Sequence, residues 1–199
     1  MIFGTLSIHP SEFIATINAK ATEVVRSRDP EERNTAWTHA VKQALAAMGR
    51  DLGFEPFFSD PQNKRSEFML DLVWWKQDQD GAWAALGVES EWGNPRVRDC
   101  KVRAGCVADD FEKLLQFKAP VKLLTFTADN NEMRRSIHDM LQRYLRQFCQ
   151  HVAGEMYLFI EFSAGQCFSH ICEIKRDGRD ESLTLKPLNN ESQRLLEVV

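Results

Sequence analysis

The stretch AWAALGVESEW (residues 82–92) joins an apolar segment to two carboxylates, Glu89 and Glu91. Its apolar residues predict a buried strand. Side chains alternate between the two faces of a strand, so Glu89 and Glu91 point to the same side and repel each other. Two like charges in such a strand require a compensating partner, and the neighbouring sequence indicates what that partner is.

A third carboxylate, Asp71, interrupts the preceding apolar segment EFMLDLVWW (residues 67–75). This segment is apolar on both faces, which predicts a central strand covered by helices. An ionised side chain in a covered strand is costly unless it is paired with a cation or binds a metal. The segment itself contains no lysine or arginine, so Asp71 also requires a partner from outside its own strand.

The turn between the two strands decides whether these acids share a face. A two-residue turn at Asp80 and Gly81 would place Asp71 opposite Ser90 and turn Glu89 to the other face. A three-residue loop that also includes Gln79, with a bulge, would place Asp71 opposite Glu89. The sequence leaves both turns open, but only the bulged hairpin explains why all three acids are present.

Three carboxylates on one face of a buried strand pair predict a site for a hard divalent cation. We therefore predict Mg²⁺ (or Mn²⁺) as cofactor, with Asp71, Glu89 and Glu91 as both metal ligands and catalytic residues. Mg²⁺ prefers oxygen ligands and keeps several waters. Such an ion can activate a water molecule and stabilise the departing oxygen in phosphodiester hydrolysis.

These residues resemble the PD-(D/E)XK nuclease superfamily, whose fold is that of restriction endonucleases. The family core is a helix, a strand carrying Asp, a strand carrying Glu-x-Lys, a helix and another strand. Asp71 resembles the first acid and Glu89 the second, and residues 109–126 resemble the continuation from helix to strand. The resemblance covers about residues 30–165 and implies a Mg²⁺-dependent nuclease, acting in defence or repair.

The chain departs from the family pattern at position 91, where glutamate stands in place of lysine. Some restriction enzymes of this fold use Glu-Ser-Glu here, and the resemblance then implies that Glu91 orients or deprotonates the attacking water. Lys113 is an alternative source of the missing positive charge, although a solvated lysine beside Glu112 is the simpler interpretation. The alternative function is a catalytically inert protein of this fold that acts through protein–protein contacts.

A basic cluster follows the acids in the stretch NPRVRDCKVRAG (residues 94–105). Arg96, Arg98, Lys101 and Arg103 are predicted to bind nucleic acid through its phosphates. The alternative is a solvated loop, since Asp99 lies among them. The sequence does not distinguish DNA from RNA, and it leaves a homodimer open.

Composition narrows the class of protein further. The formal net charge of −4 argues against a protein that coats nucleic acid through bulk positive charge. The five scattered cysteines form no zinc-ligand spacing and fit reduced thiols, so we expect a cytoplasmic protein. No segment is long and apolar enough for a membrane span, so we expect no membrane association.

The remaining pattern predicts an α/β fold of three layers, with a central mixed sheet between helices. We expect a single domain over residues 1–199, with the nuclease-like core at about 30–165, an N-terminal helix and a C-terminal extension. Asp29, Pro30 and Glu32 predict the start of the second helix. The expected helices are 9–25, 28–49, 107–117 and 131–152, and the expected strands are 54–59, 67–75, 82–92, 120–128, 155–162, 167–176 and 182–188.

Overall fold

The computed structural model describes residues 10–25, 33–59, 69–79, 81–92, 99–163, 166–174, 186–187 and 193–194. The helices within these ranges are α1 (Pro10–Val25), α2 (Arg33–Asp51), α3 (Cys100–Gln116) and α4 (Asn131–Gln147). The long strands are β1 (Glu55–Phe58), β2 (Leu72–Asp78), β3 (Gly81–Glu91), β4 (Val121–Thr127), β5 (Met156–Ser163) and β6 (Gln166–Glu173). Two short strands follow, β7 (Lys186–Pro187) and β8 (Gln193–Arg194). The predicted helix start at Asp29, Pro30 and Glu32 lies outside the described residues.

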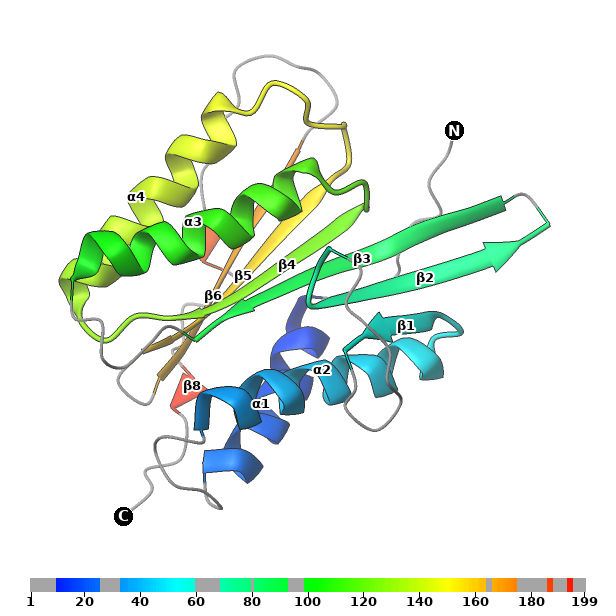
Figure 1. The fold of residues 1–199 in the computed structure, drawn as a ribbon, viewed down its shortest axis with the longest axis horizontal. Helices are drawn as coiled ribbons and strands as arrows, with labels where there is room; N and C mark the ends of the chain where they lie inside the picture. The colour runs from blue at the N-terminus through cyan, green and yellow to red at the C-terminus, as the bar shows by residue number, and fades with distance from the viewer. Residues whose placement is uncertain are drawn as a thin grey trace.

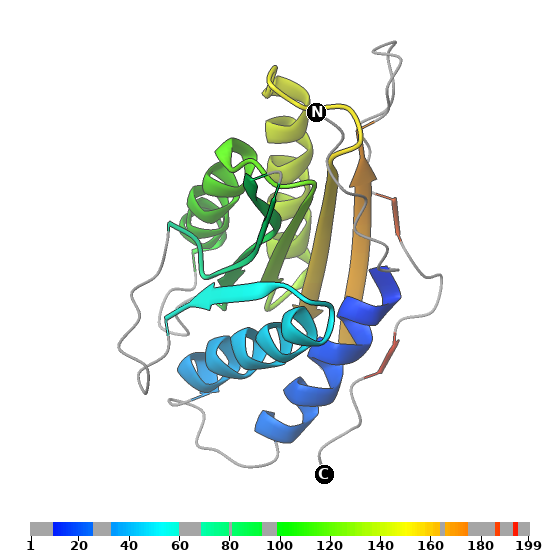
Figure 2. The same ribbon diagram turned by 90° about the vertical axis from the view of Figure 1, so that its right-hand side faces the viewer.

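The strands form one mixed sheet in the order β1-β2-β3-β4-β5-β6-β7, with β8 paired to β6. The pairs β1–β2, β2–β3 and β5–β6 are antiparallel, whereas β3–β4 and β4–β5 are parallel. Helices α1 and α2 cover one face, and α3 and α4 cover the other (Figure 1). Figure 2 shows the same two helix pairs on either side of the sheet after a quarter turn. The predicted mixed sheet between helix layers is confirmed.

Each face of the sheet has its own apolar core. Against α1 and α2 the core includes Phe13, Trp37 and Trp74, and the Trp74 indole N–H donates to the Leu45 carbonyl at 2.9 Å. Against α3 and α4 it includes Phe111, whose ring lies edge-on to Phe159. None of the helices in the described ranges is long and apolar enough to cross a membrane.

The β2–β3 hairpin combines a tight turn with a bulge. Asp78 pairs with Gly81 across the turn, which matches neither of the two predicted loops. The register shifts between Trp74 and Trp75, where β3 contains one extra residue. Beyond the bulge Leu72 pairs with Val88, and one step further brings Asp71 level with Glu89. The register that brings Asp71 level with Glu89 is therefore the expected one, but the bulge lies at Ala85 within β3 and not at the turn.

Several element boundaries differ from the sequence prediction, and those of β2, α3 and α4 differ most clearly. Strand β2 begins at Leu72, so Asp71 lies in a bend before the strand and not in its middle. Helix α3 begins at Cys100 instead of residue 107, because the Asp99 side chain accepts hydrogen bonds from the Lys101 and Val102 amides and caps the helix. Helix α4 ends at Gln147 instead of residue 152, and Phe148 has extended backbone angles.

Candidate functional site

Asp71 is held between two different elements at the start of β2. Its Oδ2 accepts the Ser90 amide N–H at 2.9 Å, which ties the bend to β3. Its Oδ1 forms an ion pair with Lys42 Nζ at 2.8 Å, and Lys42 is a buried side chain of α2. The partner that the sequence of β2 lacks is therefore supplied by a helix far upstream in the chain.

Glu89 is buried in β3 on the face covered by α3. Lys113 Nζ lies 3.3 Å from Glu89 Oε1, but this oxygen has no hydrogen-bond partner of suitable geometry among the described residues. The same ammonium donates a shorter hydrogen bond of 2.7 Å to Asp110 Oδ1. Glu89 is consequently a buried carboxylate with a nearby charge but an unsatisfied oxygen.

The charges around Glu89 oppose its ionisation. Burial, followed by the charges of Asp110 and Asp71, raises the pKa of Glu89 to about 8, although Lys113 acts in the opposite direction. Burial also raises the pKa of Asp110, against the effect of Lys113. Partial burial disfavours the Lys113 ammonium, but its hydrogen bond to Asp110 and the charge of Glu89 outweigh this effect and raise the pKa of Lys113. Glu89 and Asp110 thus share one lysine.

Close packing of α3 on β3 produces this arrangement. A Cβ atom on Gly87 would lie 2.8 Å from Leu70 Cδ1 and 2.9 Å from Phe117 Cδ1, so only glycine fits between these side chains. Phe117 caps the C-terminus of α3. The absence of a side chain at position 87 therefore lets the end of α3 that carries Asp110 and Lys113 approach the strand near Glu89.

Glu91 lies further along the same strand, beside an earlier turn of α3. Burial, followed by the charge of Glu91, raises the pKa of the Cys106 thiol. Two residues along a strand span about 6.6 Å, and four residues along a helix span about 6 Å. Glu91 therefore lies beside Cys106 in the same way that Glu89 lies beside Asp110. Among the neighbouring charged groups, Asp110 has the strongest effect on the pKa of Glu89.

The structure does not bring Asp71, Glu89 and Glu91 together at the separation of metal ligands. Within the described part of the chain, the one group of three or more His, Cys, Asp or Glu side chains with ligand atoms within 4.8 Å of one another consists of His138, Glu161 and His170. Lys42 and Lys113 occupy positions beside Asp71 and Glu89, and Glu91 is displaced toward Cys106. Lys113 is exposed, as the simpler interpretation predicts, but its ammonium also pairs with Asp110 and Glu89.

The predicted phosphate-binding cluster is divided by the start of α3. Arg103 is buried, and its guanidinium donates to Thr127 Oγ1 at 2.9 Å and to the Trp92 carbonyl at 3.4 Å. It joins the ends of β3 and β4, so it is not placed to contact phosphate. Lys101 is exposed in the first turn of α3, and Arg96 and Arg98 lie outside the described residues.

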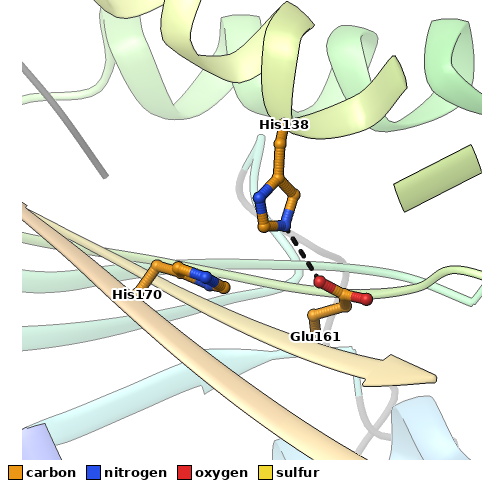
Figure 3. A group of neighbouring side chains, drawn as sticks. All are labelled: His138, Glu161 and His170. Atoms are coloured by element: carbon orange, nitrogen blue, oxygen red, sulfur yellow. Dashed lines mark hydrogen bonds and ion pairs between the residues drawn. The ribbon is translucent and has the colours of Figure 1, made fainter. Parts of the chain in front are cut away.

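A second polar cluster lies on the same face of the sheet, under α4. Glu161 on β5 is fully buried, and its Oε1 accepts a hydrogen bond of 2.6 Å from Arg134 Nε. Its Oε2 lies 2.9 Å from His138 Nε2 on α4. His170 on β6 turns toward this pair, and its ring centroid lies 4.6 Å from that of His138 (Figure 3).

The groups of this cluster favour a charged Glu161 and a neutral His170. Burial disfavours the Glu161 carboxylate, but His138 and Arg134 outweigh this effect and lower the pKa of Glu161. Burial, together with the charges of His138 and Arg134, lowers the pKa of His170 to about 4. His170 Nδ1 is buried and has no hydrogen-bond partner among the described residues.

Sequence reasoning missed Lys42, Asp110 and the whole histidine cluster, and it assigned no role to His138. One signal was available: Glu161 interrupts the apolar strand MYLFIEF just as Asp71 interrupts its own segment. No comparable signal marks Lys42 or Asp110, because helix surfaces normally carry charges.

Comparisons with known proteins add no assignment. The chain matches no protein-family model, and no curated protein matches it.

Proposed function

We propose that this chain is a Mg²⁺-dependent nuclease that hydrolyses phosphodiester bonds, with Asp71 and Glu89 as metal ligands. One observation carries the proposal: Glu89 is a buried carboxylate whose Oε1 lacks a directed hydrogen bond while two further acids surround it. A divalent cation would relieve this repulsion, and carboxylate oxygens are the ligands that Mg²⁺ prefers. Asp71 and Glu89 therefore offer the type of ligand that the ion prefers, provided that the cation displaces Lys113 from Glu89.

The order of elements supports the resemblance to PD-(D/E)XK nucleases. Helix α2 precedes the meander β1-β2-β3, and α3 then leads to β4 beside β3. Asp71 directly precedes β2, and Glu89 lies near the end of β3. This order of helices, strands and acids is similar to what the resemblance implies, and it supports the proposal.

Lys113 fits the role of the lysine that position 91 lacks. Its ammonium lies beside Glu89, and about 45% of its side chain is exposed, so a substrate phosphate can approach it. Its raised pKa keeps it protonated, which suits a group that stabilises negative charge on the phosphate and not one that removes a proton. A bound Mg²⁺ would supply water activation and leaving-group stabilisation.

The second candidate is the inert protein of the same fold, and the ion pairs favour it. Lys42 lies 2.8 Å from Asp71 Oδ1, and Lys113 lies 3.3 Å from Glu89 Oε1. In an inert descendant these lysines would neutralise the acids permanently and exclude a cation. The two candidates therefore differ in whether a cation displaces Lys113 from Glu89.

The test is cleavage of mixed single- and double-stranded DNA and RNA with Mg²⁺ or Mn²⁺, together with calorimetric titration of Mn²⁺. We expect Glu89→Gln to abolish Mn²⁺ binding at this site, and Lys113→Met to lower the cleavage rate by at least about 100-fold. The matched control is Lys118→Met, an exposed lysine just beyond α3, which should cleave as the wild type does. Wild type that neither binds Mn²⁺ nor cleaves any substrate would favour the inert protein.

A further inference from the structure

We propose that His138, Glu161 and His170 form a second metal site, which takes a divalent ion of the zinc class. The site is independent of the proposed nuclease function, because it shares no residue with the acidic cluster. It uses three separate elements, α4, β5 and β6 (Figure 3).

The three side chains are already close to the separation that a metal ion requires. Their ligand atoms all lie within 4.8 Å of one another, and His138 Nε2 lies 2.9 Å from Glu161 Oε2. Tetrahedral bonds of about 2.1 Å place ligand atoms roughly 3.4 Å apart. Side-chain adjustments of roughly an ångström therefore suffice, without movement of the strands.

His170 provides the second, independent observation. Its Nδ1 is buried without a hydrogen-bond partner among the described residues, in contrast to His151, whose two ring nitrogens contact Tyr157 Oη and the Leu145 carbonyl. A buried polar atom without a hydrogen-bond partner destabilises the folded protein. A metal–imidazole bond would offset that cost.

Arg134 fixes the carboxylate in a ligand geometry. Its Nε binds Glu161 Oε1 at 2.6 Å, and its guanidinium lies 3.8 Å from the Phe168 ring centroid. Oε1 is therefore occupied, and Oε2 is directed toward His138. Hydrogen bonds of this kind to a ligating carboxylate orient it and increase metal affinity.

The donor set selects the class of ion. Two imidazoles and one carboxylate suit Zn²⁺ and its neighbours Co²⁺ and Ni²⁺, whereas Mg²⁺ prefers an all-oxygen shell. Three protein ligands leave a fourth position for water. The ion would tie α4 to the β5–β6 hairpin, so its binding should also stabilise the fold.

The test uses Co²⁺ as a spectroscopic probe on the full chain after treatment with chelator, in excess Mg²⁺ to fill hard-cation sites. We expect wild type to bind one equivalent with the visible bands of tetrahedral Co²⁺, and Zn²⁺ to displace it. His138→Gln and His170→Gln should weaken binding by at least about 100-fold, and Arg134→Gln by about 10-fold. The matched control His39→Gln, on α2 at the other face, should bind as wild type does.

A measurement on wild type alone covers the case in which a variant fails to fold. Bound Co²⁺ should shift the ring-proton NMR signals of His138 and His170 and leave that of His39 in place. Unchanged signals, a thiolate–Co²⁺ absorption band or equal losses in the His39 and His170 variants would each overturn the site. Glu89→Gln should bind Co²⁺ normally, so failure of the nuclease proposal is distinguishable from failure of this one.

Discussion

Glu89 and Glu161 are both buried glutamates on the α3–α4 face of the same sheet, yet their surroundings are opposite. Glu161 has a guanidinium at 2.6 Å and an imidazole at 2.9 Å, and its pKa is lowered. Glu89 has an ammonium at 3.3 Å that is shared with Asp110, and its pKa is raised to about 8. Both are buried on strands, so burial alone does not decide the charge state.

The comparison shows that the number and direction of donors decide whether a buried acid is satisfied. Glu161 has a donor on each oxygen from the protein itself. The charges of Asp110 and Asp71 act against the ionised form of Glu89 and only that of Lys113 favours it, so a cation from solution would stabilise it. We therefore expect substitutions at the two positions to differ in sign.

The largest expected difference is between Glu161→Gln and Glu89→Gln at pH 8 in chelator. Glu161→Gln breaks a buried ion pair and should lower the free energy of unfolding by about 3 kcal/mol. Glu89→Gln removes a repelled charge and should raise it by about 2 kcal/mol. Denaturant unfolding measures both, with the exposed Glu173→Gln as control, expected within about 0.5 kcal/mol of wild type. Shifts of the same sign for the two variants would contradict the conclusion that Glu89 and Glu161 have opposite surroundings.

The pH dependence of the free energy of unfolding provides a second test of the environment of Glu89. Its ordinary pKa of 4.5 applies to the unfolded chain and about 8 to the folded one, so the folded state binds more protons between these values. The free energy of unfolding should fall as pH rises from 4.5 to 8 and level off above 8. The advantage of Glu89→Gln over wild type should therefore grow across that window. Urea unfolding of both proteins at several pH values measures it, and a constant difference would show that Glu89 titrates normally.

Lys113→Met tests whether Glu89 depends on its single nearby ammonium. Its loss should raise the pKa of Glu89 further and lower the free energy of unfolding at pH 8 by about 1 kcal/mol or less, since Lys113 is partly exposed. The control Lys118→Met removes an exposed lysine at the same end of the helix. Equal effects of the two substitutions would mean that Lys113 does not support Glu89.

The smallest expected effect is on the reactivity of Cys106, and it tests whether Glu91 lies beside this thiol. Glu91→Gln should lower the pKa of Cys106 and raise its alkylation rate near pH 8 by about twofold, because the thiolate is the reacting species. Peptide mass spectrometry follows Cys106 and uses the exposed Cys149 as internal control. An unchanged rate at Cys106 would place Glu91 away from the thiol and nearer Glu89.

The sequence predicted the helices, the long strands and the register that brings Asp71 level with Glu89, because periodicity and turn residues act locally. It could not predict Lys42 beside Asp71 or Asp110 beside Glu89, since these contacts depend on how helices pack on the sheet. The early start of α3 was missed because Asp99 was interpreted as part of a basic loop and not as a cap. The sequence marks Glu161 as a charge within an apolar strand. It does not predict the contacts of Glu161 with His138 and His170, because these residues lie on other elements, α4 and β6.

Glu89 shares the nearby Lys113 ammonium with Asp110, so we expect it to bind a further cation from solution. The decisive measurement is an NMR titration of the Glu89 carboxyl carbon, with and without Mg²⁺. We expect titration near pH 8 in chelator, and an ionised carboxylate throughout pH 6–9 when Mg²⁺ is bound. Glu161 should remain ionised under both conditions. Titration of Glu89 near its ordinary value, unchanged by Mg²⁺, would contradict the claim.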